Sequence, residues 1–267
     1  VSRGGFRLAG GWELVSERGG PGVEVFPGYR PDHELTEWGQ GWSNASLAIT
    51  RHQERGLLAY DASDELVSPW GPLKMSPVDG HFYPEGMMTL VRVELDTASG
   101  ALVAHLPDGS RQVYGKSAGE RVERTGKGTY RWQLSEVVDG LGHTTTLVWT
   151  ANDSGRLFLD KVQYGGVPGG AYGHEVALVY EPLAHPVSDH RSGRELVLDQ
   201  RVSAVVVRSR VRSGAKDLQE RYRFVHTYQA EASAGVGFYL TGVQKVFAVS
   251  GEKEPLVSYE YHEPSRG

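Results

Sequence analysis

The first candidates for chemistry are short polar motifs that contain glycine, histidine or acidic residues. The motif TGKGT (residues 125–129) has the Gly-Lys-Gly composition of a phosphate-binding loop. However, Gly119 precedes the Gly126-Lys127 pair by seven positions, whereas a phosphate-binding loop needs five, and no helical pattern follows. We therefore predict a simple turn at residues 125–129.

The motif HPVSDHRSG (residues 185–193) places two histidines and an aspartate close together. A metal site needs ligands that converge and a surrounding layer of hydrogen bonds that orients them. His185 and His190 flank Pro186 in a polar stretch that offers no such framework. We predict a solvated loop here, and a metal site is the alternative.

A third motif, DASDELVSP (residues 61–69), gathers three acidic residues. It lacks the glycine at the sixth loop position and the distal glutamate of an EF-hand. We predict a polar connection, with weak Ca²⁺ binding as the alternative. The surrounding residues 56–73 are expected to form a loop, because Pro69 and Pro72 limit regular strand pairing.

Two residue sets could bind a ligand without catalysing a reaction. Arg208, Arg210 and Arg212 alternate, so they share one face of a strand whose other face carries valines. The row could bind an anion, or it could be the solvated face of a sheet with a buried apolar side. The six tryptophans and thirteen tyrosines could line a sugar groove, but aromatic residues also pack across strands. For both sets we favour the structural role.

Nothing in the sequence selects a catalytic residue. General acid–base catalysis needs two carboxylates in different environments, and 33 acidic residues give no basis for choosing a pair. There is no Gly-x-Ser-x-Gly motif. The absence of cysteine excludes disulfides, zinc–thiolate sites and thiol catalysis. We assign no catalytic, cofactor-binding or metal-ligating residue and expect a protein that is not an enzyme.

Composition limits the other classes of function. The chain of 267 residues has a net charge of −5, which argues against nucleic-acid binding through overall electrostatics. No apolar run approaches the ~18–20 residues of a membrane span, and no signal peptide is visible. The chain begins with Val1 and ends on a strand-like segment, so we expect a fragment of a longer protein.

From residue 88 onward, the sequence predicts β-hairpins. Short runs of β-branched and aromatic residues end in Gly, Asp or Asn turns, for example at residues 96–100 and 107–109. The Asp108-Gly109 pair favours a type I′ turn. The run at residues 144–150 alternates, and residues 151–155 reverse the chain into a second strand at residues 157–164. Gly, Pro, Thr and Val interrupt every candidate for a long helix.

A loose repeat links three of the predicted strands. The repeat begins near Gly155, Leu196 and Phe238, and each copy places leucine and valine at similar spacing. Repeated hairpins stack into one extended sheet. Glycine makes up 35 residues, about 13% against an average near 7%, and such a content lets a sheet turn and curve.

Several phrases, taken in order, resemble a known family. GQGWSNASLAITR (residues 39–51) is followed by GLLAYDASDEL (residues 56–66), LPDGSRQVYGKSAGERV (residues 106–122) and YRWQLSEVVDGLGHTTTLVW (residues 130–149). The stretch from VALVYEP to SAVVV (residues 176–207) completes the set. This order resembles the N-terminal region of the RHS/YD-repeat toxins, namely the virulence plasmid protein B type and the B component of ABC (Tc) toxin complexes. The sequence departs from the family pattern at His143, where the family has asparagine, and at Thr150, where it has an aromatic residue.

The resemblance implies an all-β fold in which antiparallel hairpin repeats form part of a large curved sheet, an RHS-type β shell or its N-terminal segment. It implies residues 39–267 as the shell region, preceded by an irregular segment at residues 1–38. It also implies a secreted bacterial toxin component whose partners are the remainder of the shell and an enclosed toxic polypeptide. In such a shell, the arginine row could line the interior and pair with acids of that polypeptide. No cofactor, nucleic acid or membrane span is expected.

Two other functions stay open. A free-standing β-rich module could bind glycans or a surface receptor. A hydrolase with dispersed catalytic carboxylates is the third hypothesis, and a bell-shaped pH–rate profile would support it.

Overall fold

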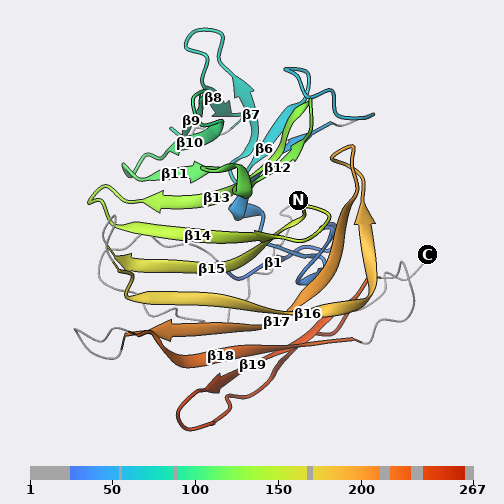
Figure 1. Cartoon of the computed structure of the whole chain (residues 1–267), viewed down its shortest axis with the longest axis vertical. Helices are drawn as coiled ribbons and strands as arrows, with labels where there is room; N and C mark the ends of the chain where they lie inside the picture. Colours follow the sequence, from blue (N-terminus) through green and yellow to red (C-terminus); the bar gives the residue numbers. More distant parts are fainter. Residues whose placement is uncertain are drawn as a thin grey trace.

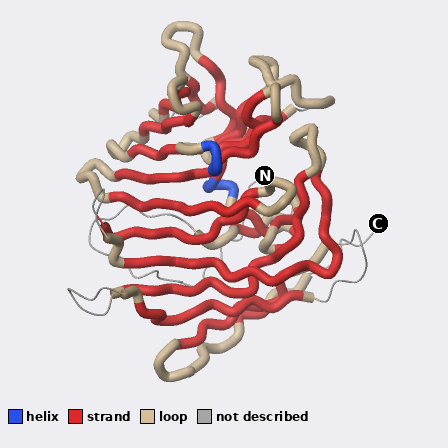
Figure 2. Tube along the Cα trace, in the orientation of Figure 1, coloured by secondary structure: helices blue, strands red, loops and turns tan. Residues whose placement is uncertain are grey.

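The computed structural model describes residues 25–53, 56–86, 90–166, 171–210, 217–229 and 237–261, and these are almost entirely β structure. The only helices among them are two short 3₁₀ turns, η1 (Ala45–Leu47) and η2 (Ala118–Glu120), which stand out in Figure 2 against the strands. The predicted all-β class and the predicted lack of long helices are confirmed for these residues. None of their helices has the length and apolar character needed to cross a membrane.

The described residues form twenty strands. Their bounds are β1 (Gly28–Tyr29), β2 (Leu35–Thr36), β3 (Gly39–Gln40), β4 (Trp42–Ser43), β5 (Ala48–His52), β6 (Glu65–Ser68), β7 (Gly71–Met75), β8 (Phe82–Pro84), β9 (Arg92–Asp96), β10 (Ala101–His105), β11 (Arg111–Tyr114), β12 (Arg121–Arg124), β13 (Gly128–Val138), β14 (Thr144–Ala151), β15 (Leu157–Gly166), β16 (His174–Asp189), β17 (Leu196–Ser209), β18 (Gln219–Tyr228), β19 (Leu240–Phe247) and β20 (Val257–Ser258).

Eight of these strands close into an antiparallel barrel. The order β5-β6-β7-β8-β9-β10-β11 returns to β5 through β13, which pairs with β11 along one edge and with β5 along the other. Strand β13 can do this because its eleven residues are long enough to pair with different strands at its two ends. The barrel forms the upper part of Figure 1. The sequence predicted an extended sheet but not this closure.

The same sheet continues beyond the barrel. Strand β14 also pairs with β13, and the order then runs antiparallel through β15, β16, β17, β18 and β19 to β20. Figure 1 shows these strands stacked below the barrel. The three copies of the predicted repeat fall mainly on β15, β17 and β19, which are alternate strands of this sheet.

Strands β16 and β17 bend because β16 carries extra residues. Pro182 faces Gln200 and Val187 faces Leu198, so the four residues 183–186 lie opposite the single residue Asp199. Such bulges bend a strand and increase its twist. In Figure 1 the two strands turn upward at the right, and the hairpin tip at residues 190–195 lies toward the barrel.

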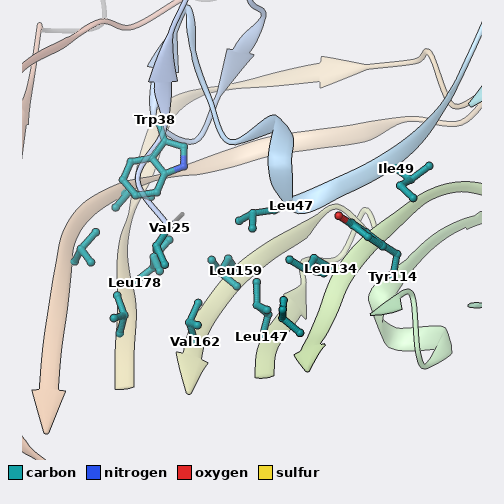
Figure 3. Close-up of a cluster of buried hydrophobic side chains, with 14 of the residues drawn as sticks. Val25, Trp38, Leu47, Ile49, Tyr114, Leu134, Leu147, Leu159, Val162 and Leu178 are labelled. Atoms are coloured by element: carbon teal, nitrogen blue, oxygen red, sulfur yellow. The ribbon is translucent and has the colours of Figure 1, made fainter. Parts of the chain in front are cut away.

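The main core lies between the sheet and the N-terminal part of the described chain. Leu147, Leu159, Val162 and Leu178 project from successive strands toward Trp38, as Figure 3 shows. Val25 and Leu47 belong to the same cluster, and Ile49 and Tyr114 continue it into the barrel. Residues 25–38, predicted to be irregular, contain only the short strands β1 and β2 but contribute directly to this core. The predicted boundary at residue 38 stays a prediction.

Two local predictions are corrected by the structure. Residues 65–75 do not form a loop: β6 and β7 pair with Pro69 and Trp70 as the turn, and Pro72 faces Val67 within the ladder. The turn after β10 is a five-residue loop, since His105 faces Arg111, and not a type I′ turn. Asp108 does not have the positive φ that type I′ requires. The turns at residues 96–100 and 151–155 are confirmed.

Candidate functional site

The motif at residues 125–129 forms the turn that the sequence predicts. It connects β12 to β13, and the backbone N–H of Lys127 donates to the carbonyl oxygen of Arg124 at 2.9 Å. No α-helix follows the turn, so nothing here offers the helix N-terminus that cradles a phosphate.

The histidine motif is divided between two structural elements. His185 lies in the bulge of β16, so the predicted loop is wrong for this residue, whereas His190 lies in the turn after β16. In that turn Asp189 forms an ion pair with Arg191 at 2.6 Å. Within the described ranges, no group of three or more His, Asp or Glu residues is placed to hold a metal ion.

The acidic motif is organised around Asp64, whose side chain is fully buried. Its carboxylate accepts hydrogen bonds from the backbone N–H groups of Ala59 and Tyr60, at 3.0 and 2.6 Å, and from Gln53 Nε2 at 3.0 Å. Arg51 Nη1 lies 3.3 Å away. Burial raises the pKa of Asp64, but these donors and the Arg51 charge outweigh it and leave the pKa below its usual value. The carboxylate therefore orders the loop and is already neutralised by an arginine.

The arginine row is also structural in the part that the structure describes. Arg208 Nη1 lies 2.6 Å from Glu175 Oε1 on the neighbouring strand β16. Val205 and Val207 face the core, as the alternation predicts. Arg212 and Val211 lie outside the described residues.

Aromatic side chains are used for packing. Trp38, Trp42 and Trp132 are buried, and Trp70 and Trp149 pack against the same core from partly exposed positions. Tyr180 and Tyr228 donate their hydroxyl hydrogens to the carbonyl oxygens of Leu159 and Val202, at 2.7 and 2.6 Å. Trp12 lies outside the described residues.

The buried aromatic and aliphatic side chains gather on one face of the curved sheet. We call this the inner face and define it as the side that carries the main core. Residues 25–47 of the chain itself lie across this face. Trp38 meets His226 edge-on, with ring centroids 5.5 Å apart, and Phe26 meets Phe224 in the same way at 5.2 Å. This segment therefore covers the apolar side of β16–β19.

Backbone hydrogen bonds fix the position of residues 25–47 against the sheet. The N–H of Val202 donates to the carbonyl oxygen of Glu37 at 2.9 Å, and the N–H of Gln40 donates to that of Phe238 at 2.8 Å. The Glu37 carboxylate also lies 3.6 Å from Arg156, the residue just before β15. Gly39 permits this approach, because a Cβ there would lie 3.1 Å from Phe238 O, and its φ is +103°.

His226 is the titratable group buried beneath this segment. Burial lowers its pKa to about 4, and this effect outweighs a hydrogen bond to the backbone of Phe224, which acts in the opposite direction. His226 is therefore neutral near pH 7, and its protonation would place a charge against Trp38.

The C-terminal part of the described chain also contacts residues 25–47, through Tyr259 and Tyr261. Trp42 Nε1 donates to Tyr261 Oη at 2.8 Å, and Tyr261 Oη donates to Leu240 O at 2.6 Å. The rings of Trp42 and Tyr259 meet edge-on at 5.0 Å. The two ends of the described chain thus pack together on the inner face.

The hairpin tip of β16 and β17 contacts the loop before β6. Tyr60 Oη donates to the carbonyl oxygen of Ser192 at 2.5 Å. Arg51 and Arg124 both lie 5.7 Å from the Tyr60 ring centroid. The bent hairpin is therefore fixed to the barrel by a cation–π and hydrogen-bond junction.

Comparison with known proteins identifies the fold. No family model matches the chain, and no curated protein matches it by sequence. Among solved structures, the N-terminal domain of the effector protein SpvB from Salmonella typhimurium strain LT2 matches with a TM-score of 0.73 and 17% identity, over 92% of this chain and 98% of that one. The chain has the fold of the SpvB N-terminal domain.

The same fold occurs within Tc toxin structures. The TcdB2-TccC3-Cdc42 structure matches with a TM-score of 0.75 and 15% identity, over 90% of this chain and 15% of that chain. A Photorhabdus luminescens Tc holotoxin pore matches with a TM-score of 0.74 and 16% identity, over 88% of this chain and 14% of that chain. The SpvB-like chain thus spans a small part of those larger proteins. The expected resemblance is confirmed at the level of fold.

Sequence reasoning missed two features of the site. It did not predict that residues 25–47 cover the inner face, although Trp38 and Trp42 in a glycine-rich stretch were a signal that this stretch is anchored. It also missed the end of the barrel, where a cavity of about 310 Å³ lies beside residues 61–66. Barrel closure brings these residues together with β7 and β8, and no local pattern shows such closure.

Proposed function

We propose that this chain is a non-enzymatic structural segment of a secreted bacterial toxin of the RHS/Tc type. In this proposal it forms part of a β wall that encloses or presents a toxic polypeptide for delivery. The observation that carries the proposal is the fold shared over about nine tenths of the chain with the SpvB domain and with Tc toxin structures.

The architecture supports a role as wall. One antiparallel sheet runs through nearly the whole described chain, and its curvature comes from bulges in strands such as β16 and β17. The apolar inner face is covered by residues 25–47 of the same chain. An enclosed polypeptide would therefore contact other, more polar surfaces of the wall. This suits a cargo that must later be released, because large apolar interfaces are typical of permanent complexes.

The proposal is tested by protease protection. The complete natural protein that contains this chain is purified together with the polypeptides that accompany it, and the mixture is treated with trypsin under native conditions. We expect an accompanying polypeptide to resist digestion and to be cleaved rapidly after release by mild denaturation. An accompanying polypeptide digested at the same rate in both states, or the absence of one, would overturn the proposal.

A further inference from the structure

The open end of the barrel contains a cavity that the wall function does not use. It has a volume of about 310 Å³. Its apolar lining consists of Ala62, Leu66, Leu73, Met75 and Phe82, and the rest of its lining is polar or charged, namely Arg51, Asp61, Ser63, Asp64, Glu65 and Lys74. Leu66 faces Leu73, and Met75 faces Phe82, across adjacent strand pairs. These side chains share the inward side of the barrel. Mouths of β-barrels are common ligand sites, and a cavity of this size holds one large apolar side chain.

The cavity is open to solvent. Met75 is 57% exposed, although it follows Leu73 on the inward face. Val78, in the turn between β7 and β8, is 93% exposed at the same end of the barrel. Exposed apolar side chains around a cavity indicate a binding site, and the flexible thioether of methionine adapts to different partners.

One lip of the cavity is rigid. It is formed by residues 61–65, and the buried carboxylate of Asp64 fixes the backbone just before them. Tyr60, next to this lip, is anchored to Ser192 of the bent hairpin. Because this lip is already held on both sides, little conformational entropy is lost there when a ligand binds.

The charges around the mouth favour a cationic ligand. Asp61 accepts hydrogen bonds from Ser63 and Asp79 accepts them from His81 and Tyr83, and these bonds lower the pKa of both carboxyls, that of Asp79 to about 2. Both are therefore ionised at neutral pH. Neither forms an ion pair within the described residues. Of the two cations that line the cavity, Arg51 is already paired with Asp64, and Lys74 is already paired with Glu65 and Glu85.

From this combination we infer that the barrel mouth binds a basic peptide segment of a partner polypeptide. One aliphatic or aromatic side chain would enter the cavity, and flanking lysine or arginine residues would face Asp61 and Asp79. The inference rests on the apolar part of the cavity, on Asp61 in its lining, and on Asp79 in the turn that connects the lining strands β7 and β8. It is independent of whether the chain encloses a toxin.

The test uses the peptide acetyl-Lys-Lys-Leu-Lys-Lys-amide and the methyl resonance of Met75. The chain has three methionines, so a methyl-labelled sample gives a simple spectrum, and Met75→Leu assigns the signal. We expect the chemical shift of the Met75 methyl group to change as peptide is added and to reach a plateau. Replacing the central leucine of the peptide by serine, or its lysines by glutamates, should abolish that change.

Matched variants of the protein make the test specific. The double variant Asp61→Asn with Asp79→Asn should weaken binding of the lysine peptide by about 5- to 20-fold, from two partly exposed charge contacts. Asp108→Asn is the control. Asp108 accepts the same bonds from Ser110 N and Oγ that Asp61 accepts from Ser63, but it lies at the other end of the barrel. This control should leave affinity unchanged.

Three results would overturn the inference. The first is a Met75 signal that does not move at about 5 mM peptide, where a contact of about 3 kcal/mol would be half occupied. The second is equal binding of the serine or glutamate peptides, which would indicate non-specific attraction. The third is an equal loss of affinity in Asp108→Asn and in the double variant. Circular dichroism reports whether each variant is folded.

Discussion

Tyr60 and Ser192 lie 132 positions apart in the chain, yet the Tyr60 hydroxyl donates to the Ser192 carbonyl oxygen. Among the described residues, Tyr60 is the only one other than glycine with a positive φ, at +66°. A non-glycine residue in this region costs free energy and persists where the surrounding contacts fix it. The bond thus joins the barrel to the tip of the β16–β17 hairpin.

Removing this bond should loosen the hairpin tip. We expect Tyr60→Phe to lower the free energy of unfolding by about 1 kcal/mol, the usual net value of one hydrogen bond. It should also speed proteolysis within residues 189–194. Urea denaturation and limited proteolysis measure the two effects. Tyr83→Phe, which removes an exposed hydroxyl from Asp79, is the comparison and should leave this tip as resistant as in the parent chain.

The Asp64 carboxylate should be more important for stability than its acidic neighbours. Asp64→Asn leaves Arg51 without its buried partner, and loss of one member of a buried ion pair costs about 3–5 kcal/mol. Asp61→Asn, at the exposed start of the same turn, should leave the free energy of unfolding nearly unchanged. Equal effects in urea denaturation would contradict the assignment of Asp64 as the organiser of the loop.

Trp38 should hold residues 25–47 against the inner face. Trp38→Ala removes a side chain that is 2% exposed, and such a truncation costs about 3–5 kcal/mol. Hydrogen exchange should rise first in residues 25–43 and in β18, while β9–β11 of the barrel stay protected. Val249→Ala, at a position that is 94% exposed, should change neither pattern. Uniform loss of protection across the barrel would show that the segment is not a separate layer.

The close approach of Gly39 to β19 can be tested by adding one methyl group. Gly39→Ala would place Cβ 3.1 Å from Phe238 O and 3.2 Å from Leu240 N, at a φ of +103°. Gly126→Ala also has a positive φ, but its Cβ would enter open space. We expect a cost of about 1 kcal/mol for Gly126→Ala from backbone conformation alone, and a clearly larger cost for Gly39→Ala. Similar thermal shifts for the two variants would refute the tight packing.

Stability should fall with acidification through His226. Its pKa is about 4 in the folded chain and 6.5 in the unfolded chain, so the unfolded state binds the proton first. Folding should therefore lose up to about 3 kcal/mol from this group as the pH falls from about 6.5 to about 4, with no further loss below that. His226→Gln should flatten the profile in this window. A parent chain whose free energy of unfolding is the same at pH 7 and pH 4.5 would be inconsistent with a buried, neutral His226.

The sequence was sufficient for the class of fold because hairpins are local. Alternation at residues 144–150 and the Asn152–Gly155 turn specify β14 and β15 without distant information. Closure of the barrel depends on β13 pairing with both β5 and β11, and such non-local pairing leaves no local pattern. The prediction of a loop from Pro69 and Pro72 was wrong because the turn accommodates Pro69 and the β6–β7 ladder accommodates Pro72.

The candidate sites divide in the same way, because sites made of neighbouring residues were predictable from the sequence and sites that form only on folding were not. The turn at residues 125–129 was predictable from glycine spacing alone. The burial of Asp64 was not, because its charge suggested a solvated position and its donors come from residues 51–60 folded around it. The barrel mouth combines residues from β6, β7 and β8, so it exists only after folding.

The proposal that this chain is a wall around a toxic polypeptide is tested most directly by native mass spectrometry. The natural protein is purified from its own host without denaturation, and the masses of the intact assembly and of its denatured components are compared. The account predicts an additional polypeptide that stays bound under native conditions and separates only on denaturation. A single species of 29.3 kDa, with no other polypeptide in either state, would contradict it.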